Sequence, residues 1–241
     1  MTRLLIVDDS TPVADRDQLP RTIGDALGWE VTTARRPDDL PALLDEHDEF
    51  DLAMVDLSYA NSTLNGLDAL LMLHERAPAC RLVVYTQGDA PFADMLRDAW
   101  DAFDLGSALS KLSDLDPMLR TLERVVRDGC APVDPVLLPL LPAQRSPWRS
   151  VAGYGRLVGH AGHAKLWRAL IELDNEPSYR DLAEHTGLSI QSVRNYRSEL
   201  LGDLALHYLQ APRMREMQRF AKRCRPLLAP HIRTKLGDGS V

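Results

Sequence analysis

Five short apolar runs, each ending at a polar residue or a turn, place the strongest constraint on how the first half of this 241-residue chain folds. Stretches with the apolar spacing of helices separate the runs, and this alternation is typical of a parallel, doubly wound α/β sheet. We therefore predict a five-stranded α/β domain over residues 1–129. Its strands are expected at Leu4–Val7, Glu30–Thr33, Leu52–Val55, Leu82–Tyr85 and Ala108–Leu109.

The residues that follow four of these runs are suited to phosphoryl chemistry. They are Asp8 and Asp9, then Asp56, then Thr86, then Lys111. Ligands of open parallel sheets bind beyond the carboxyl ends of the strands, so we expect these side chains to converge. Carboxylates suit Mg²⁺, and one of them is a competent nucleophile. A hydroxyl and an ammonium suit the oxygens of a phosphoryl group.

These motifs also carry a family resemblance. In order and spacing, residues 2–129 resemble the receiver domain of two-component response regulators, through Asp8-Asp9, Val55-Asp56-Leu57, Tyr85-Thr86 and Ser110-Lys111. The resemblance implies a flavodoxin-like fold in which Asp56 accepts a phosphoryl group from a sensor histidine kinase. It implies a Mg²⁺ site made of Asp8, Asp9, Asp56 and the backbone carbonyl of Ser58. Thr86 and Lys111 would bind the phosphoryl oxygens.

Some positions depart from the family pattern. Ala108 stands where the family has a switch aromatic, no Met-Pro follows Asp56, and Ser58–Asn65 is about two residues longer than expected. These departures leave open a second interpretation, in which the receiver is a phosphorylation-independent dimerisation or ligand-binding module. A third interpretation, a phosphatase with Asp56 as nucleophile, lacks a good general acid because Ser58 is a poor one. We therefore expect a regulator and not an enzyme.

Residues 130–160 differ from what precedes them. Five prolines and three glycines interrupt regular structure, so we predict a linker with a short helix near Val136–Leu141. Charge also changes along the chain. Residues 1–149 have 14 basic and 26 acidic side chains, a net charge of −12, whereas residues 150–241 have 14 and 9, a net charge of +5. A polyanion would therefore bind the second part.

Residues 161–241 are predicted to be an all-α helix-turn-helix domain. Ala183 is small where two helices meet, Gly187 permits a tight turn, and Ser189 can cap a second helix at 190–201. Residues 164–225 resemble the LuxR/NarL-type output domain, although Tyr196 and Asp203 replace its usual histidine and lysine. The resemblance implies that the second helix enters the major groove of DNA.

Individual contacts follow from position on that helix. We expect Arg194, Asn195 and Ser198 to reach base edges, because arginine and asparagine can each make paired hydrogen bonds to a base. Gln191, Ser192 and Arg197 are expected to bind phosphates. The arginines of residues 213–225 are better explained as the solvated face of an amphipathic helix. His160 and His163 have metal-pair spacing, but no further ligand lies near them in the sequence.

Together these features predict a DNA-binding response regulator that controls transcription at promoter sites, most simply as a homodimer. The chain has no apolar run of membrane-spanning length and no signal-like start, and its three cysteines are far apart. We therefore expect a cytoplasmic protein with no membrane segment. The sequence does not identify the signal, the kinase, the promoters or the direction of control.

Overall fold

The computed structural model describes residues 1–9, 18–47, 49–60, 62–88 and 90–237. They form two compact units, Met1–Arg145 and Ser146–Val241. The first unit contains every strand of the described chain, and the second contains only helices. The predicted fold class, an α/β sheet followed by an all-α unit, is confirmed.

The sheet of the first unit is five-stranded and parallel, with the order β2-β1-β3-β4-β5. All five predicted strands are present, and the last is longer than its apolar pattern indicated. Their bounds are β1 Arg3–Val7, β2 Glu30–Ala34, β3 Leu52–Val55, β4 Arg81–Thr86 and β5 Leu105–Ser110. Residues Leu4–Val7 of β1 and all of β3 are buried on both faces, which is why these two strands appear in the sequence as continuous apolar runs and not as alternating ones.

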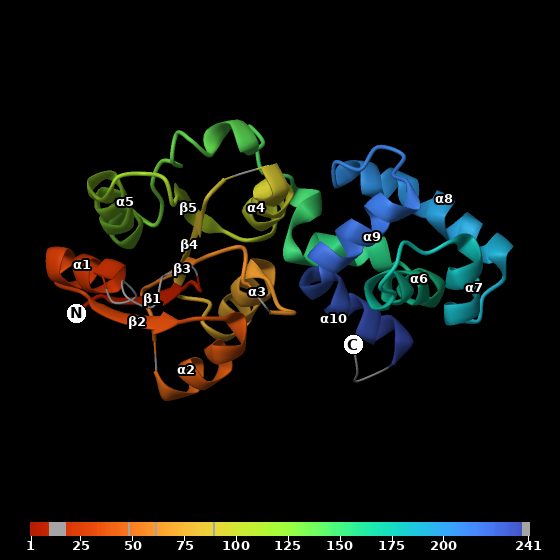
Figure 1. Cartoon of the computed structure of the whole chain (residues 1–241), viewed down its shortest axis with the longest axis horizontal. Helices are drawn as coiled ribbons and strands as arrows, with labels where there is room; N and C mark the ends of the chain where they lie inside the picture. The colour runs from red at the N-terminus through yellow and green to blue at the C-terminus, as the bar shows by residue number, and fades with distance from the viewer. Residues whose placement is uncertain (10–17, 48, 61, 89, 238–241) are drawn as a thin grey trace. The chain divides into compact units, whose positions relative to one another are not determined.

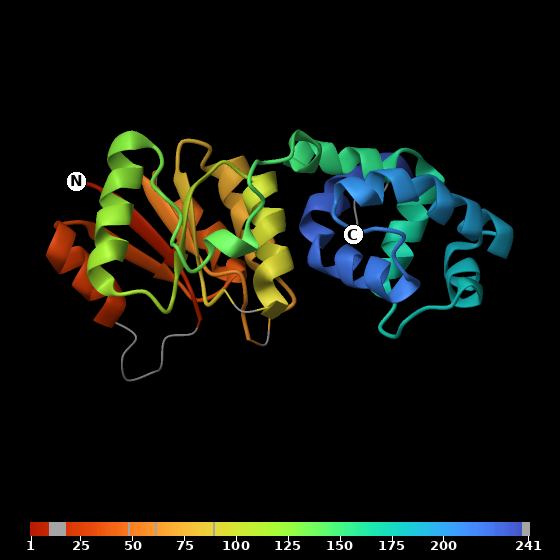
Figure 2. The same cartoon turned by 90° about the horizontal axis from the view of Figure 1, so that it is seen from above.

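Helices cover both faces of this sheet (Figures 1 and 2). Helices α1 (Gln18–Leu27) and α5 (Leu115–Asp128) contact each other and bury Ile23, Leu122 and Val125 against one face. Helices α2 (Leu40–Glu46), α3 (Gly66–Arg76) and α4 (Ala90–Ala102) contact one another in series on the other face. A 3₁₀ turn, Pro37–Asp39, leads into α2.

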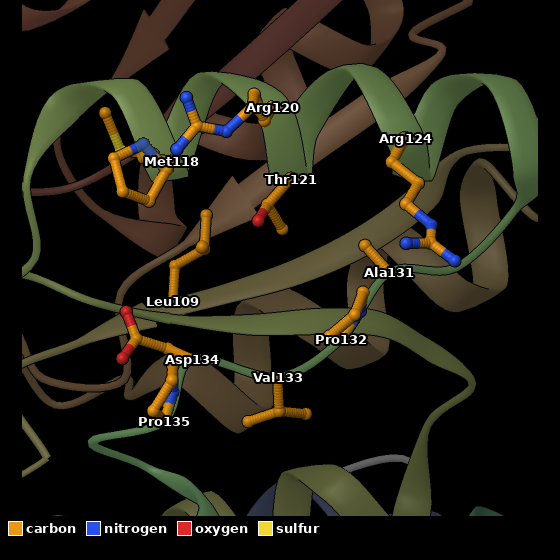
Figure 3. A pocket seen from close by; sticks show the side chains of 11 residues that line it. Leu109, Met118, Arg120, Thr121, Arg124, Ala131, Pro132, Val133, Asp134 and Pro135 are labelled. Carbon is orange, nitrogen blue, oxygen red and sulfur yellow. The ribbon is translucent and has the colours of Figure 1, made fainter.

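The chain after α5 returns along the outer edge of β5. The Ala131 amide donates to the Gly106 carbonyl at 2.9 Å, and the Asp134 amide donates to the Ala108 carbonyl at 2.9 Å. Beyond this segment Leu137 is fully buried, and a 3₁₀ turn follows at Leu138–Leu140. Figure 3 shows this return segment facing α5 across a pocket of about 370 Å³. Residues 131–145 thus pack on the sheet unit.

The described part of the second unit, residues 146–237, contains seven helical segments. They are the 3₁₀ helices Pro147–Arg149 and Val151–Val158 and the α-helices α6 Ala161–Glu172, α7 Tyr179–Thr186, α8 Ile190–Leu206, α9 Met214–Arg223 and α10 Arg225–Leu236. Helix α6 contacts all four other α-helices. Its Trp167 is fully buried and donates from Nε1 to the Leu157 carbonyl at 2.7 Å. The core of the unit is therefore built around α6.

The prediction that Gly153 and Gly155 interrupt regular structure is wrong, because both lie inside the 3₁₀ helix Val151–Val158. They serve close packing. A Cβ on Gly153 would come within 2.2 Å of the Trp148 carbonyl oxygen, and one on Gly155 within 3.1 Å of the His231 ring. Tyr154, between them, is fully buried.

Two helix starts also differ from prediction. The sequence Asp116-Pro117 has the pattern of a helix cap followed by a first helical residue, but helix α5 begins after Asp114, so Pro117 lies in its first turn. Asp38 likewise suits the cap of a helix at 39–46, but Pro37–Asp39 forms a 3₁₀ turn and α2 follows it. In both places proline near a helix start is compatible with more than one register, since its missing N–H is not needed anywhere in the first turn.

Candidate functional site

The predicted acidic residues meet at the carboxyl ends of adjacent strands. Asp8 and Asp9 follow β1, and Asp56 follows β3, its neighbour in the sheet. One carboxylate oxygen from each lies within 4.8 Å of the others. Asp56 is buried, while Asp8 and Asp9 are partly exposed. This is a compact set of hard oxygen ligands of the kind that bind Mg²⁺.

Lys111 closes the same site from the end of β5. Its Nζ lies 2.9 Å from Asp8 Oδ1 and 2.9 Å from Asp56 Oδ2. Its backbone amide donates to the Thr86 carbonyl at 2.9 Å, which ties the ends of β4 and β5 together. When all four groups are ionised, the three carboxylates and the ammonium give this cluster a net charge of −2. The donor set and its charge both fit a divalent cation.

The protonation of Asp56 reflects its position. Burial raises the pKa of Asp56 from 3.8 to about 6, although the charge and hydrogen bond of Lys111 act to lower it. The pKa of Lys111 is raised: burial acts to lower it, but the neighbouring charges of Asp56 and Asp8 outweigh burial. The carboxylate and the ammonium therefore stabilise each other's charged form, and near pH 7 Asp56 is predominantly an anion.

Tyr59 is a residue of this site that sequence reasoning missed. Its buried hydroxyl lies 2.8 Å from the Asp56 carbonyl and 3.2 Å from the Val7 carbonyl, and donates to this pair. It therefore fastens the loop after β3 to the ends of both strands. The neighbouring Ala60 amide donates to Asp9 Oδ2. These contacts lie in the longer loop noted at Ser58–Asn65, of which Asn61 is outside the described residues.

Gly66 allows helix α3 to start directly behind Asp56. A Cβ on Gly66 would come within 2.5 Å of the Asp56 carbonyl oxygen and within 2.5 Å of Leu57 Cα. Asn65 caps this helix by accepting a hydrogen bond from the Leu67 amide at 2.8 Å. Only glycine fits this contact without moving the backbone. Gly66 therefore lets the start of α3 pack directly against the backbone of Asp56 and Leu57.

A pocket of about 250 Å³ opens over these groups. It brings together the predicted residues Asp9, Asp56, Ser58, Thr86 and Lys111, and it adds three that were not predicted as part of it, Ala60, Gln87 and Phe92. Asp8 belongs to the site through its contact with Lys111. Thr86 is only 2% exposed. The pocket thus presents a carboxylate, a hydroxyl-bearing residue and an ammonium to one small volume.

Ala108 is fully buried beneath the return segment, and it offers no ring that could swing in response to Thr86. Next to β5, Tyr85 on β4 brings an aromatic ring close to the site, with its centroid 5.3 Å from Lys111 Nζ. Tyr85 packs on the sheet face that is covered by α1 and α5.

The second unit contains the predicted helix-turn-helix. Helix α7 ends at Gly187, which has the left-handed φ of 68° expected of a tight turn. Ser189 caps α8 through the Ser192 amide at 3.0 Å, and Leu182 and Val193 are fully buried between the helices. Helix α8 runs to Leu206, five residues beyond its predicted end. These features confirm the local structure of the motif.

The candidate DNA-contact residues lie in the first half of α8. Gln191, Arg194, Asn195 and Ser198 are exposed, whereas Ser192 and Arg197 are half-buried. Gln191 donates to Asn195 Oδ1 at 2.9 Å, and the Arg197 guanidinium donates to the Pro212 carbonyl at 2.6 Å. Arg197 therefore also holds the loop before α9, a role that its position in the sequence did not indicate.

No helix within the described ranges is both long and apolar enough to cross a membrane.

The similarity of this chain to known proteins was found in its structure. No family model and no curated protein matches the sequence. RcsB from Salmonella enterica serovar Typhimurium, solved bound to promoter rprA with phosphomimetic BeF₃⁻, aligns over 92% of this chain and 98% of its own at 14% identity, with a TM-score of 0.52.

Two partial matches cover about half of the chain. A LuxR-family two-component response regulator from Aurantimonas sp. SI85-9A1 aligns over 58% of this chain and 94% of its own, at 20% identity and a TM-score of 0.48. Vibrio cholerae chemotaxis protein CheY4 aligns over 52% and 98%, at 24% identity and a TM-score of 0.43. The RcsB alignment spans both units. The chain therefore shares the fold of RcsB, with an α/β unit followed by a helical unit.

Proposed function

We propose that this protein is a DNA-binding response regulator that is phosphorylated on Asp56 by a sensor histidine kinase and controls transcription. The observation that carries the proposal is the contact of Lys111 with both Asp56 and Asp8, at 2.9 Å each, beside a pocket that Asp56, Lys111 and Thr86 line. An aspartate that only ends a strand and begins a turn would not require a lysine and a second carboxylate beside it.

The acidic cluster would hold Mg²⁺ through Asp8, Asp9, Asp56 and the Ser58 carbonyl. The ion would supply positive charge to the phosphoryl oxygens during transfer. Lys111 is placed to bind one phosphoryl oxygen, because its Nζ already lies beside Asp56 Oδ2. Thr86 would donate its hydroxyl to another. These residues do no covalent chemistry, and they contribute position and charge, which dominate phosphoryl transfer.

The covalent step would belong to Asp56 alone. A carboxylate oxygen attacks phosphorus, so an acyl-phosphate P–O bond forms. The P–N bond to the kinase histidine breaks, and its electron pair stays on the imidazole. The reaction consumes one phosphoryl group per chain and leaves the donor's imidazole to be protonated by solvent. Hydrolysis later restores the carboxylate and releases inorganic phosphate.

The output would be DNA binding by α8. Support comes from the exposed Arg194, Asn195 and Ser198 on one half of that helix, from the net positive charge of residues 150–241, and from the promoter-bound state of the RcsB structure. We propose that the protein binds double-stranded promoter sites as a homodimer. We also propose that it is cytoplasmic, because the core of the kinase that would phosphorylate it lies in the cytoplasm. Symmetric dimers commonly bind such sites.

Intact-mass spectrometry tests the chemistry directly. The wild type incubated with Mg²⁺ and a small phosphoryl donor should gain a single phosphoryl group, while Asp56→Asn, or omission of Mg²⁺, should abolish the adduct. One adduct per chain supports a regulator, whereas many cycles of donor hydrolysis per chain would support the phosphatase interpretation. No adduct on a folded protein would contradict the proposal.

A second candidate function keeps the DNA-binding unit and removes the phosphoryl switch. The buried Ala108 and the covered edge of β5 favour it, because the aromatic part of the switch is absent there. In that case the receiver unit would act as a constitutive dimerisation or ligand-binding module. DNA affinity that is equal with and without the Asp56 adduct would favour this second function over the first.

A further inference from the structure

A second cluster of metal-binding groups lies in the helical unit, far from the acidic cluster in the sequence. His160 precedes α6, His163 lies in its first turn, and Glu199 lies on α8. Glu199 Oε2 is 3.3 Å from His160 Nε2 and 3.1 Å from His163 Nε2. His163 is buried, whereas His160 and Glu199 are exposed, so the cluster is open to solvent on one side.

These distances fit a tetrahedral metal site. Donor atoms that each lie 2.0–2.1 Å from a Zn²⁺ ion are about 3.3 Å from one another. The two imidazole nitrogens meet a single carboxylate oxygen at this separation. We propose that His160, His163 and Glu199 bind one Zn²⁺ ion, or a similar borderline divalent transition metal, with the fourth position open to water. The two nitrogen ligands favour such a metal over Mg²⁺, because Mg²⁺ prefers oxygen ligands.

The surroundings hold the two rings in place. The His160 and His163 ring centroids lie 3.9 Å apart, and the Tyr196 ring packs edge-on against both, at 5.0 and 5.7 Å. Gly162 makes this packing possible, since a Cβ there would come within 2.5 Å of the Tyr196 ring. The sequence His-Ala-Gly-His therefore provides both ligands and the space for the ring that orients them.

Metal binding would change one local contact in a way that can be measured. His160 Nδ1 accepts hydrogen bonds from the Gly162 and His163 amides at the start of α6. If Nε2 binds metal, the proton of the neutral ring moves to Nδ1, which then ceases to accept. The cap is lost and replaced by a stronger link between α6 and α8. The Gly162 and His163 amides would therefore report the metal directly.

This site is independent of the proposed phosphoryl chemistry. It joins the first turn of α6 to α8 next to Ser198, one of the predicted DNA-contact positions. A bound cation would neutralise Glu199 at that point of the helix. The site would therefore make the stability of the helical unit depend on the metal, whether or not Asp56 is ever phosphorylated.

Calorimetric titration of the full-length chain with Zn²⁺, in excess Mg²⁺ to occupy the acidic cluster, tests the proposal. One Zn²⁺ should bind per chain. His160→Asn keeps a good helix cap but removes one ligand, and Glu199→Gln keeps the shape but removes the charge. Each should weaken binding by more than about 100-fold, beyond the effect of an outer partner. His185→Asn, which alters the separate His185–Glu172 pair, should leave Zn²⁺ affinity unchanged.

Nuclear magnetic resonance provides a second measurement on the same samples. The Gly162 and His163 amides should shift on addition of Zn²⁺ in the wild type and not in Glu199→Gln. Either of two results would overturn the proposal: no Zn²⁺ bound by the wild type, or Zn²⁺ bound as tightly by His160→Asn and Glu199→Gln as by the wild type. The three side chains would then be a helix cap and an ion pair only.

Discussion

The Asp134 carboxylate accepts a hydrogen bond from the Ser110 backbone amide at 3.3 Å, across 24 residues of sequence. Ser110 is the last residue of β5 and directly precedes Lys111. Asp134 also accepts from the Ser113 hydroxyl and from the Val136 amide. A single buried carboxylate in the return segment therefore holds the turn that carries the site lysine.

Replacing this carboxylate should loosen that turn. We expect Asp134→Ala to lower the free energy of unfolding by about 2–3 kcal/mol, because it leaves a buried amide and a hydroxyl without their acceptor. Denaturant unfolding followed by circular dichroism measures the change. Asp128→Ala, on the exposed end of α5, is the matched control and should have no measurable effect. Equal stabilities of the two variants would show that the hydrogen bonds of the Asp134 carboxylate do not hold the turn.

Mg²⁺ binding at the acidic cluster should weaken as the pH falls through 6. The pKa of metal-free Asp56 is about 6, and a proton on this carboxylate competes with the cation. Apparent Mg²⁺ affinity at pH 5 should therefore be about tenfold below that at pH 7, with little further gain at pH 8. Calorimetric titration at each pH tests this. An affinity that is flat between pH 5 and 7 would contradict either the pKa or the participation of Asp56.

Two glycines at helical positions should respond oppositely to alanine. Gly66→Ala would push a Cβ into the Asp56 backbone, and we expect a loss of about 2–3 kcal/mol in unfolding free energy together with weaker Mg²⁺ binding. Gly202, in α8, has nothing within 4 Å of a Cβ, so Gly202→Ala should stabilise by about 0.5–1 kcal/mol. Thermal melts of both variants decide the matter, and a tolerated Gly66→Ala would remove the proposed constraint.

The two arginines of α8 should separate binding from folding. Arg194 is exposed, with its guanidinium 5.4 Å from the Tyr179 ring, and we expect Arg194→Ala to weaken binding to a selected DNA site by about 1–3 kcal/mol without altering stability. Arg197→Ala should lower the melting temperature as well as weaken DNA binding, since it removes the hydrogen bond to the Pro212 carbonyl together with a predicted phosphate contact. Fluorescence anisotropy with duplexes selected from a random pool, beside thermal melts, measures both effects.

The sequence predicts the receiver-like site well because strand ends are local features. Asp8, Asp56 and Lys111 each end a recognisable apolar run, and parallel strands bring such ends to one edge of a sheet. The helix-turn-helix was equally accessible, through the spacing of Ala183, Gly187 and Ser189. Register within helices was not, as α5 shows by starting after Asp114 and not after Asp116.

What the sequence does not reveal depends on contacts between distant residues. Tyr59 lies on a loop of no recognised pattern, and its hydroxyl meets Val7 from 52 positions away. Glu199 follows His163 by 36 positions, so the histidine pair appeared to lack a third ligand. Gly153 and Gly155 were interpreted as linker residues, because a glycine that permits close packing and one that permits flexibility are identical in sequence.

The return segment after α5 has a practical consequence for handling the sheet unit alone. An expression fragment cut at residue 129 would lose the strand-like pairing of Ala131 and Asp134 with β5. The outer edge of that strand would then present unsatisfied amides and carbonyls to other copies, the usual start of edge-to-edge aggregation. A soluble fragment should therefore extend to Arg145, whose guanidinium donates to Asp104 and to the Leu105 carbonyl at the first residue of the same strand.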